Sequence, residues 1–290
     1  MALSLAACGG SSTTTTTATD TTTTTTTTTD AAQSIALTIA ADTVTGGSGA
    51  DAISGARVDG IVTLNASDVV DGGAGVDTLT ARTVEGLATS SISNVENVVF
   101  TETGAGGDTI VFSTAAATYI SGVTSITNLA STNNLTFGRV TESADLTVNN
   151  SATTTTLQFA DSVLTGTADS ITVNLNAATA AVTVGTVTDA DGDYETLVIN
   201  ASGAASDLVA GGGLGGDATT VDVNASVAVD LGTTASFAAL TSFDASDSTA
   251  GVTAVFANKA AAGTTAVSIT GGAGADNFDI SALTAANHGA

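Results

Sequence analysis

The chain has no proline and no tryptophan, one cysteine, and only four basic residues among its 290. The single cysteine, Cys8, excludes an internal disulfide framework. The four cations (Arg57, Arg82, Arg139 and Lys259) are outnumbered by 28 acidic residues, which gives a formal net charge of −24. Nucleic acids and bare anionic membranes are bound by clustered Lys and Arg, so this composition excludes both as partners. No run of about 18 apolar residues is present, so no transmembrane helix is expected.

The apolar side chains that are present are mostly small or branched. Hydrophobic residues make up 43% of the chain, aromatic residues only 3%, and there are 32 glycines. Such a chain can bury a core of thin, regular layers, and its glycines predict many tight turns. Many of the acids occur in those turns. We interpret this as partial neutralisation by divalent cations; the alternative is a solvated acidic surface.

The N-terminal segment reads as an export and tether region. Leu5-Ala6-Ala7-Cys8 resembles a bacterial lipobox, although the first eight residues contain no Lys or Arg and only a short apolar stretch. Residues 1–8 are therefore expected to be the remnant of a truncated lipoprotein signal, with Cys8 as the lipidated residue and the only link to a membrane. Residues 9–33 are nearly all Thr, Ser and Gly, which predicts a disordered linker.

Residues 34–290 predict a body made of strands. Short β-prone runs recur every 10–20 residues or so, many alternate apolar side chains with Thr, Asn or Ser, and Gly/Asn/Asp/Ser clusters separate them. The sequence predicts an all-β fold, a parallel β-solenoid with glycine–aspartate turns, in which Asn side chains stack in ladders. A multi-strand β-sandwich is the alternative. A sub-boundary is expected near 100–120.

Three segments share one pattern, G-G-x-G-x-D-x-U-x, where U is a large apolar residue. The glycines allow a tight turn that points carbonyl oxygens inward, and the aspartate adds a charged oxygen. Ca²⁺ takes about six to eight oxygen ligands in flexible geometry, so one turn supplies half a shell and a neighbouring coil the rest. The residues concerned are Gly46, Gly47, Gly49 and Asp51; Gly72, Gly73, Gly75 and Asp77; and Gly271, Gly272, Gly274 and Asp276.

Further acids extend this prediction. Asp42 and Asp68 each lie nine residues before a motif aspartate, the distance of one repeat, and are expected to belong to partner turns. Asp217 in GGLGGDATT and Asp108 in TGAGGDTIV occupy incomplete copies of the pattern. The segment DADGDYE places Asp189, Asp191 and Asp193 in one tight loop, with a spacing that differs from an EF-hand. Each could bind calcium; the alternative is an acidic turn that caps backbone groups.

Together, GGAGVDTL (72–79), ISNVENVVF (92–100) and VSITGGAGADNFD (267–279) resemble RTX-type calcium-binding bacterial surface-layer and adhesin proteins. The resemblance implies a β-solenoid, bound Ca²⁺, an extracellular location on the bacterial cell surface, self-association into an array, and contact with envelope polysaccharide. Members of that family are usually exported by a C-terminal type I signal, which conflicts with the lipobox and leaves two secretion routes open.

Catalysis is not expected. His288 is the only histidine, Tyr119 and Tyr194 are the only tyrosines, and basic residues are few, so general acid–base groups and aromatic sugar platforms are scarce. The expected function is a cell-surface structural protein, a surface-layer or sheath-like subunit whose folding and assembly depend on calcium. A surface adhesin or stalk is the alternative, and a carbohydrate-active β-helix enzyme a remote one.

Overall fold

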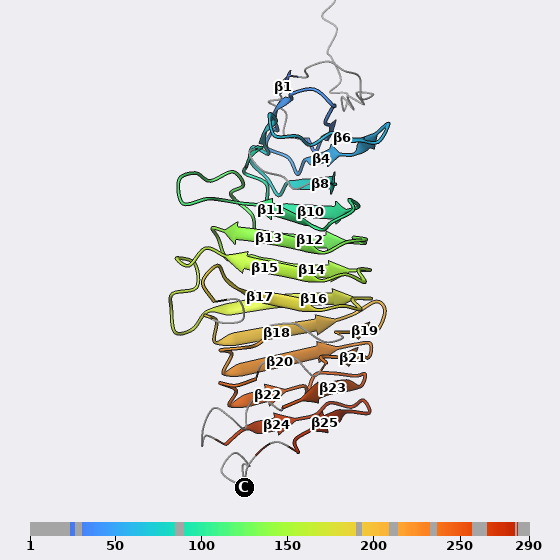
Figure 1. The fold of residues 1–290 in the computed structure, drawn as a ribbon, viewed down its shortest axis with the longest axis vertical. Helices are drawn as coiled ribbons and strands as arrows, with labels where there is room; N and C mark the ends of the chain where they lie inside the picture. Colours follow the sequence, from blue (N-terminus) through green and yellow to red (C-terminus); the bar gives the residue numbers. More distant parts are fainter. Residues whose placement is uncertain are drawn as a thin grey trace, which may run out of the picture.

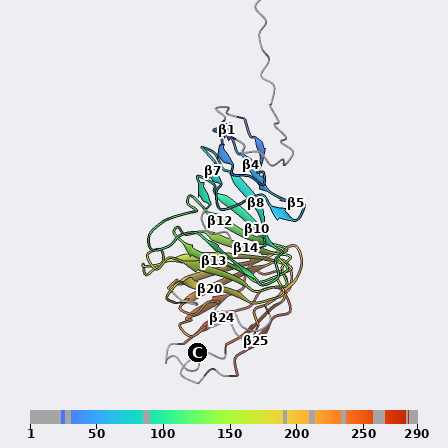
Figure 2. The same ribbon diagram turned by 45° about the horizontal axis from the view of Figure 1, so that its top comes forward.

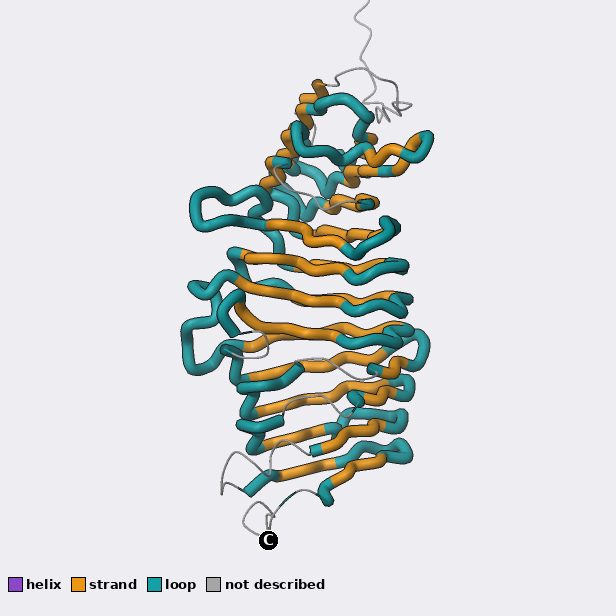
Figure 3. Tube along the Cα trace, in the orientation of Figure 1, coloured by secondary structure: helices purple, strands orange, loops and turns teal. Residues whose placement is uncertain are grey.

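The computed structural model describes residues 24–26, 31–84, 90–189, 193–208, 214–232, 237–256, 266–281 and 283. Within these ranges the chain forms 25 β-strands and no helix, so it also contains no helix able to cross a membrane (Figure 3). The strands form coils stacked along one axis, from the N-terminal coils in blue to the C-terminal coils in red (Figures 1 and 2). The predicted parallel β-solenoid is therefore confirmed.

One long sheet runs along the stack. It contains eleven strands, all parallel to their neighbours, and each coil contributes one of them. In order, these are β2 (Ser34–Ala36), β4 (Ala52–Gly55), β8 (Thr78–Thr83), β10 (Asn97–Glu102), β12 (Ser125–Leu129), β14 (Asp145–Asn149), β16 (Ser170–Asn176), β18 (Thr196–Ala201), β20 (Thr220–Ala225), β22 (Ser242–Asp244) and β24 (Ser268–Thr270).

Three shorter parallel sheets, each of four strands, complete the coils. The first contains β1 (Thr24–Thr26), β3 (Thr43–Thr45), β7 (Val69–Asp71) and β9 (Ser91–Ser93). The second contains β11 (Asp108–Val111), β13 (Leu135–Val140), β15 (Thr155–Phe159) and β17 (Val182–Thr186). The third contains β19 (Ser206–Asp207), β21 (Val229–Asp230), β23 (Val252–Val255) and β25 (Asn277–Asp279). A small antiparallel hairpin, β5 (Arg57–Val58) and β6 (Ile61–Val62), projects from one N-terminal coil (Figure 1).

Coil length varies widely. Equivalent positions in the long sheet are 18 residues apart between Ser34 and Ala52, but 28 residues apart between Asn97 and Ser125. The long sheet nevertheless stays continuous, because the strands keep their register while the turns and excursions absorb the difference. Insertions therefore alter the corners of the solenoid and leave its core strands aligned.

The core follows the two-residue period of the strands. In β16 and β18 every second side chain is buried, so Val, Leu and Ile from successive coils stack on one another. Larger side chains gather at the C-terminal coils, where the ring of Phe243 lies 5.2 Å from Phe256 and 5.5 Å from Phe278, edge to face. Because the interior of the solenoid is narrow, small layers of such side chains from each coil fill it.

The outward face of the long sheet carries the predicted asparagine ladder. Asn174, Asn200 and Asn224 occupy equivalent positions in β16, β18 and β20. The Asn200 amide donates to Asn174 Oδ1 at 2.9 Å, and the Asn224 amide donates to Asn200 Oδ1 at 3.3 Å. Each coil is thus tied to the next through side chains as well as through the backbone.

The N-terminal tract differs in part from expectation. Thr24–Thr26, assigned above to a disordered linker, form β1 and pair with Thr43–Thr45. Thr has high β-propensity, and the open edge of β3 offers these residues backbone partners. Cys8 and most of the Thr tract lie outside the described residues. The boundary near 100–120 stays a prediction: the long sheet is continuous there, whereas β9 ends one short sheet and β11 begins another.

Candidate metal sites

The first two glycine–aspartate turns stack directly on one another. Residues 46–51 connect β3 to β4, and residues 72–77 connect β7 to β8 in the next coil. The Gly46 N–H donates to Asp71 O at 2.8 Å, and the Ala74 N–H donates to Gly47 O at 2.9 Å. Glycine is required at this contact, because Gly73 has a φ of 93°. The neighbouring turn that the motif requires therefore lies in direct contact at this corner.

Each motif aspartate hydrogen-bonds to the backbone of the preceding coil. Asp51 Oδ1 accepts the Gln33 N–H at 2.8 Å, and Asp77 Oδ1 accepts the Asp51 N–H at 2.7 Å. The second oxygens differ. Asp51 Oδ2 accepts the Gly47 N–H at 2.8 Å, whereas Asp77 Oδ2 is buried and has no hydrogen-bond partner. A buried, unpartnered carboxylate oxygen is costly, and a cation would satisfy it.

The side-chain positions of two glycines are filled by oxygen. A Cβ added to Gly46 would collide with the Gly72 carbonyl oxygen and lie 2.5 Å from Asp51 Oδ2. A Cβ added to Gly72 would collide with the Asn94 carbonyl oxygen and lie 2.7 Å from Asp77 Oδ2. A carboxylate oxygen and a carbonyl oxygen of the next coil thus converge over each glycine. These hard oxygen donors fit a Ca²⁺ ion.

The electrostatics of this corner favour a positive partner. Burial raises the pKa of Asp77, the hydrogen bond from Asp51 N–H lowers it, and the charges of Asp51, Glu96 and Asp71 raise it further. Burial likewise raises the pKa of Asp68, against hydrogen bonds from the Asn65 and Asp42 backbones. Carboxylates from successive coils are therefore held close together with few cations nearby.

The two upstream aspartates are arranged differently from the prediction. Asp42 and Asp68 were expected to lie in partner turns for Asp51 and Asp77. Instead, Asp68 Oδ1 accepts the Asp42 N–H at 2.9 Å, and both residues precede strands of the first short sheet. They form their own pair between neighbouring coils, because stacking joins equivalent positions one whole coil apart. The nine-residue step only moves along a coil to its next strand.

The third complete motif stacks on a turn that lacks the pattern. The Ala273 N–H donates to Ser248 O at 2.8 Å, and a Cβ on Gly272 would collide with that same oxygen. Asp276 is fully engaged: Oδ1 accepts the Val252 N–H at 3.0 Å and Oδ2 accepts the Gly272 N–H at 2.8 Å. In this structure Asp276 therefore closes the turn by itself.

The incomplete motif at 103–108 contains an acid that the sequence did not single out. Glu102 is fully buried; it accepts hydrogen bonds from Thr83 Oγ1 at 2.7 Å and from the Gly104 N–H. Its carboxyl group also faces that of Asp108, whose Oδ2 is buried without another partner. Burial and this contact with Asp108 raise the pKa of Glu102 to about 7. Glu102 is therefore expected to keep its proton at pH values where an ordinary glutamate is ionised.

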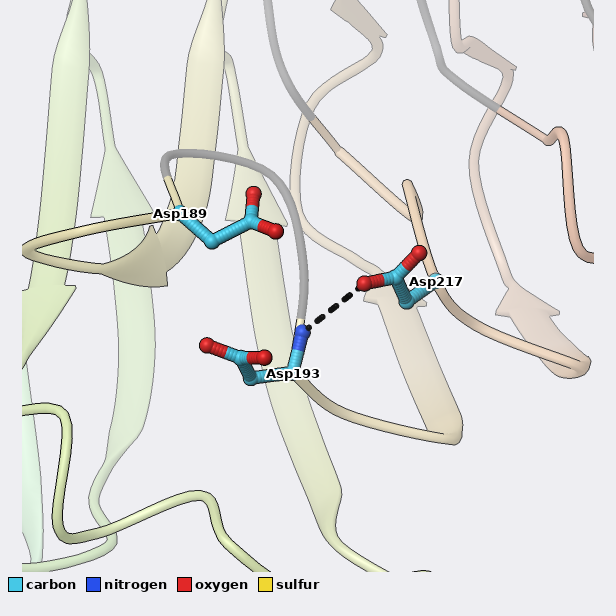
Figure 4. A group of neighbouring side chains, drawn as sticks. All are labelled: Asp189, Asp193 and Asp217. Atoms are coloured by element: carbon cyan, nitrogen blue, oxygen red, sulfur yellow. Dashed lines mark hydrogen bonds between the residues drawn. The ribbon is translucent and has the colours of Figure 1, made fainter.

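A third arrangement joins two motifs that the sequence treated separately. Asp189 and Asp193 come from the DADGDYE loop and Asp217 from GGLGGD, and Figure 4 shows these three side chains near one another. One carboxylate oxygen from each lies within 4.8 Å of the others. The Asp193 N–H donates to Asp217 Oδ2 at 3.3 Å, and Thr186 Oγ1 donates to Asp193 Oδ2 at 2.8 Å. The cluster could hold a metal ion. Asp191 lies outside the described residues.

Acidic residues form a wider ladder at the start of the strands of the long sheet, and the glycine–aspartate pattern marks only two of them. An acidic residue stands directly before β4, β8, β10, β16 and β18, namely Asp51, Asp77, Glu96, Asp169 and Glu195. Glu96 Oε2 accepts the Asp77 N–H, and Glu195 Oε2 accepts the Asp169 N–H, both at 2.8 Å. The available signal was an acid immediately before a β-prone run, as in ISNVENVVF.

Comparisons with protein-family models, with curated proteins and with solved structures give no match for this chain. The candidate sites therefore rest on their own geometry.

Proposed function

We propose that this protein is a structural subunit of a bacterial cell surface, extracellular and non-catalytic, whose coils are tightened and whose copies assemble when calcium binds at the glycine–aspartate turns. The observation that carries the proposal is the pair of stacked turns at 46–51 and 72–77. There, buried aspartates face carbonyl oxygens of the next coil, and Asp77 Oδ2 has no other partner. Calcium is the ion whose ligand preference matches carboxylates plus carbonyls.

Two further features support this role. The described residues form an elongated stack rather than a rounded body, which suits a repeated unit of a sheath or layer (Figure 1). The formal charge of −24 makes copies repel one another, so a divalent cation that neutralises carboxylates also favours their approach. The cluster of Asp189, Asp193 and Asp217 is a second place for such an ion.

The same proposal includes a way of holding the subunit at the cell surface. A lipidated Cys8 would anchor the subunit to the membrane, the Thr-rich tract would carry the solenoid outward, and self-association or envelope polysaccharide would hold it in the array. An elongated solenoid also suits an adhesin stalk, which would not need calcium-driven assembly.

The test is a titration of the whole chain with CaCl₂ against EGTA, following far-UV circular dichroism during heating together with light scattering. Extracellular calcium modules bind at about 10⁻⁴–10⁻³ M, so we expect the melting temperature and the scattering to rise in that range. If EGTA leaves both unchanged, the turns are stabilised by hydrogen bonds alone and the proposal fails. A rise in melting temperature without scattering would favour the stalk.

A further inference from the structure

We infer that the calcium site at Asp77 is completed by residues 93–96, Ser-Asn-Val-Glu, a turn that lacks the glycine–aspartate pattern. This inference rests on the proposed function and names the second half of one site. Ser93 ends β9 and residues 94–96 connect it to β10, one coil beyond the 72–77 turn. The Gly72 N–H donates to Ser93 O at 2.9 Å, so the two turns are in direct contact.

Asn94 takes the role of a glycine in this turn. Its φ is 52°, in the left-handed region that Asn tolerates better than most residues. Its carbonyl oxygen points over Gly72, where a side chain would collide with it and where Asp77 Oδ2 also lies. The structure therefore brings one carboxylate oxygen and one carbonyl oxygen together over a residue without a side chain.

The Asn94 side chain explains why Asp77 keeps a free oxygen. Its Nδ2 donates to Asp71 Oδ1 at 2.8 Å, and the same oxygen accepts the Gly73 N–H at 3.1 Å. In the preceding coil the equivalent N–H, from Gly47, is bonded to the motif aspartate Asp51 instead. The hydrogen bond from Asn94 holds the Asp71 carboxylate where it accepts the Gly73 N–H. Asp77 Oδ2 does not receive that N–H and is left to bind a cation.

Glu96 completes the arrangement as a charged positioning residue. Its Oε2 accepts the Asp77 N–H at 2.8 Å, which fixes the backbone that carries the carboxylate. Its charge, with that of Asp71, raises the pKa of Asp77 and gives the corner a surplus of negative charge. Carboxylates and a carbonyl in flexible surroundings favour Ca²⁺ over Mg²⁺, which requires nearly ideal octahedral geometry.

The experiment compares the full-length protein with three isosteric variants: Asp77→Asn, Glu96→Gln and the control Glu142→Gln. Glu142 Oε2 accepts the Gly122 N–H at 2.7 Å, so it binds the backbone of a neighbouring coil just as Glu96 does. Glu96 lies next to Asp77, whose Oδ2 is buried without a hydrogen-bond partner. Among the described residues, Glu142 has no such neighbouring carboxylate oxygen. Calcium binding is measured by isothermal titration calorimetry, and thermal unfolding is followed in EGTA and in CaCl₂.

We expect Asp77→Asn to lose one bound ion. Its melting temperature in EGTA should equal or exceed that of the parent, because a buried unpartnered charge is gone, whereas the parent should be the more stable in CaCl₂. Glu96→Gln should weaken the same ion about 10–100-fold, the usual effect of removing a residue that orients a ligand. Glu142→Gln should bind like the parent.

Three results would overturn the inference. If the parent binds calcium and all three variants bind the same number of ions equally tightly, the ions lie at other turns, and only the proposed function survives. If Asp77→Asn loses an ion but Glu96→Gln binds normally, the 93–96 turn is not the second half of the site. If the parent binds no calcium, the proposed function fails as well.

Discussion

The buried Glu102–Asp108 pair makes stability depend on pH in a direction opposite to that of most carboxylates. The perturbation is Glu102→Gln, which keeps the shape and an acceptor for the Gly104 N–H but removes the titration. A Gln amide can donate toward Asp108 as the protonated carboxyl does. All measurements are made in EGTA, so that proton binding is the only event at this corner.

The expected size follows from the pKa shift. Glu102 has a pKa of about 7 in the folded protein against 4.5 for the ordinary side chain, because burial and contact with Asp108 disfavour its charged form. Between these values the folded protein holds a proton that the unfolded chain has released, so stability is lost as the pH rises through this window. The rise in the pKa of Glu102 from 4.5 to about 7 corresponds to a loss of about 3 kcal/mol of stability across this window.

The assay is equilibrium unfolding in urea, followed by far-UV circular dichroism from about pH 4.5 to pH 8. The parent and the variant share every other acid, so the difference between them isolates this pair. We expect the free energy of unfolding of Glu102→Gln, relative to the parent, to rise by about 3 kcal/mol across the range. Glu142→Gln, which removes a carboxylate on the exposed side of a turn, serves as the control. A difference that stays within about 0.5 kcal/mol at all pH values would refute the raised pKa of Glu102.

Three further substitutions probe the stack, each by urea unfolding against the parent. Gly72→Ala should cost about 3 kcal/mol or more, because its Cβ would collide with the Asn94 carbonyl oxygen; a loss below about 1 kcal/mol would mean that the corner relaxes freely. Phe243→Ala should cost about 3–5 kcal/mol, since its ring packs between other rings, and a smaller loss would show that the coil collapses into the cavity. Asn200→Ala removes two side-chain hydrogen bonds of the asparagine ladder, including the one to Asn174, and should lower the free energy of unfolding by about 1 kcal/mol. An unchanged free energy of unfolding would mean that water replaces these hydrogen bonds.

The strands were largely predictable from the sequence, because a two-residue period with one buried face is visible in short segments. LTFGRV and DLTVN coincide with β13 and β14. The strands β12 and β15 are harder to recognise, because polar side chains occupy inward positions too: Asn128 and Thr155 are both buried. The large apolar position of the motif, Ile53 and Leu79 in the first two copies, is buried, as its place in a short strand favours.

The contacts between turns were not predictable. Which turns stack depends on coil length, and this varies between 18 and 28 residues along the chain. The sequence therefore suggested Asp42 as a neighbour for Asp51 at a fixed nine-residue step, whereas the structure stacks Asp51 on Asp77, a whole coil away. The residues that share the Asp77 corner, Asn94 and Glu96, lie in ISNVENVVF, which lacks the glycine–aspartate pattern, so the sequence did not mark them as neighbours of Asp77.

Under the proposed function, the second oxygen of each motif aspartate determines which turn gains most from a bound cation. In a parallel stack, equivalent acids recur at the strand spacing of about 4.8 Å, so every ladder of carboxylates sets like charges against one another. Backbone N–H groups relieve this at Asp51 and Asp276, where both oxygens are hydrogen-bonded. They fail to do so at Asp77, where Asp71 takes the available donor. Glycine–aspartate turns of one pattern are thus unequal in structure: both carboxylate oxygens are hydrogen-bonded at Asp51 and Asp276, whereas Asp77 keeps one buried oxygen without a hydrogen-bond partner. Calcium should then tighten the N-terminal coils most, and the response to chelation should be graded along the solenoid axis.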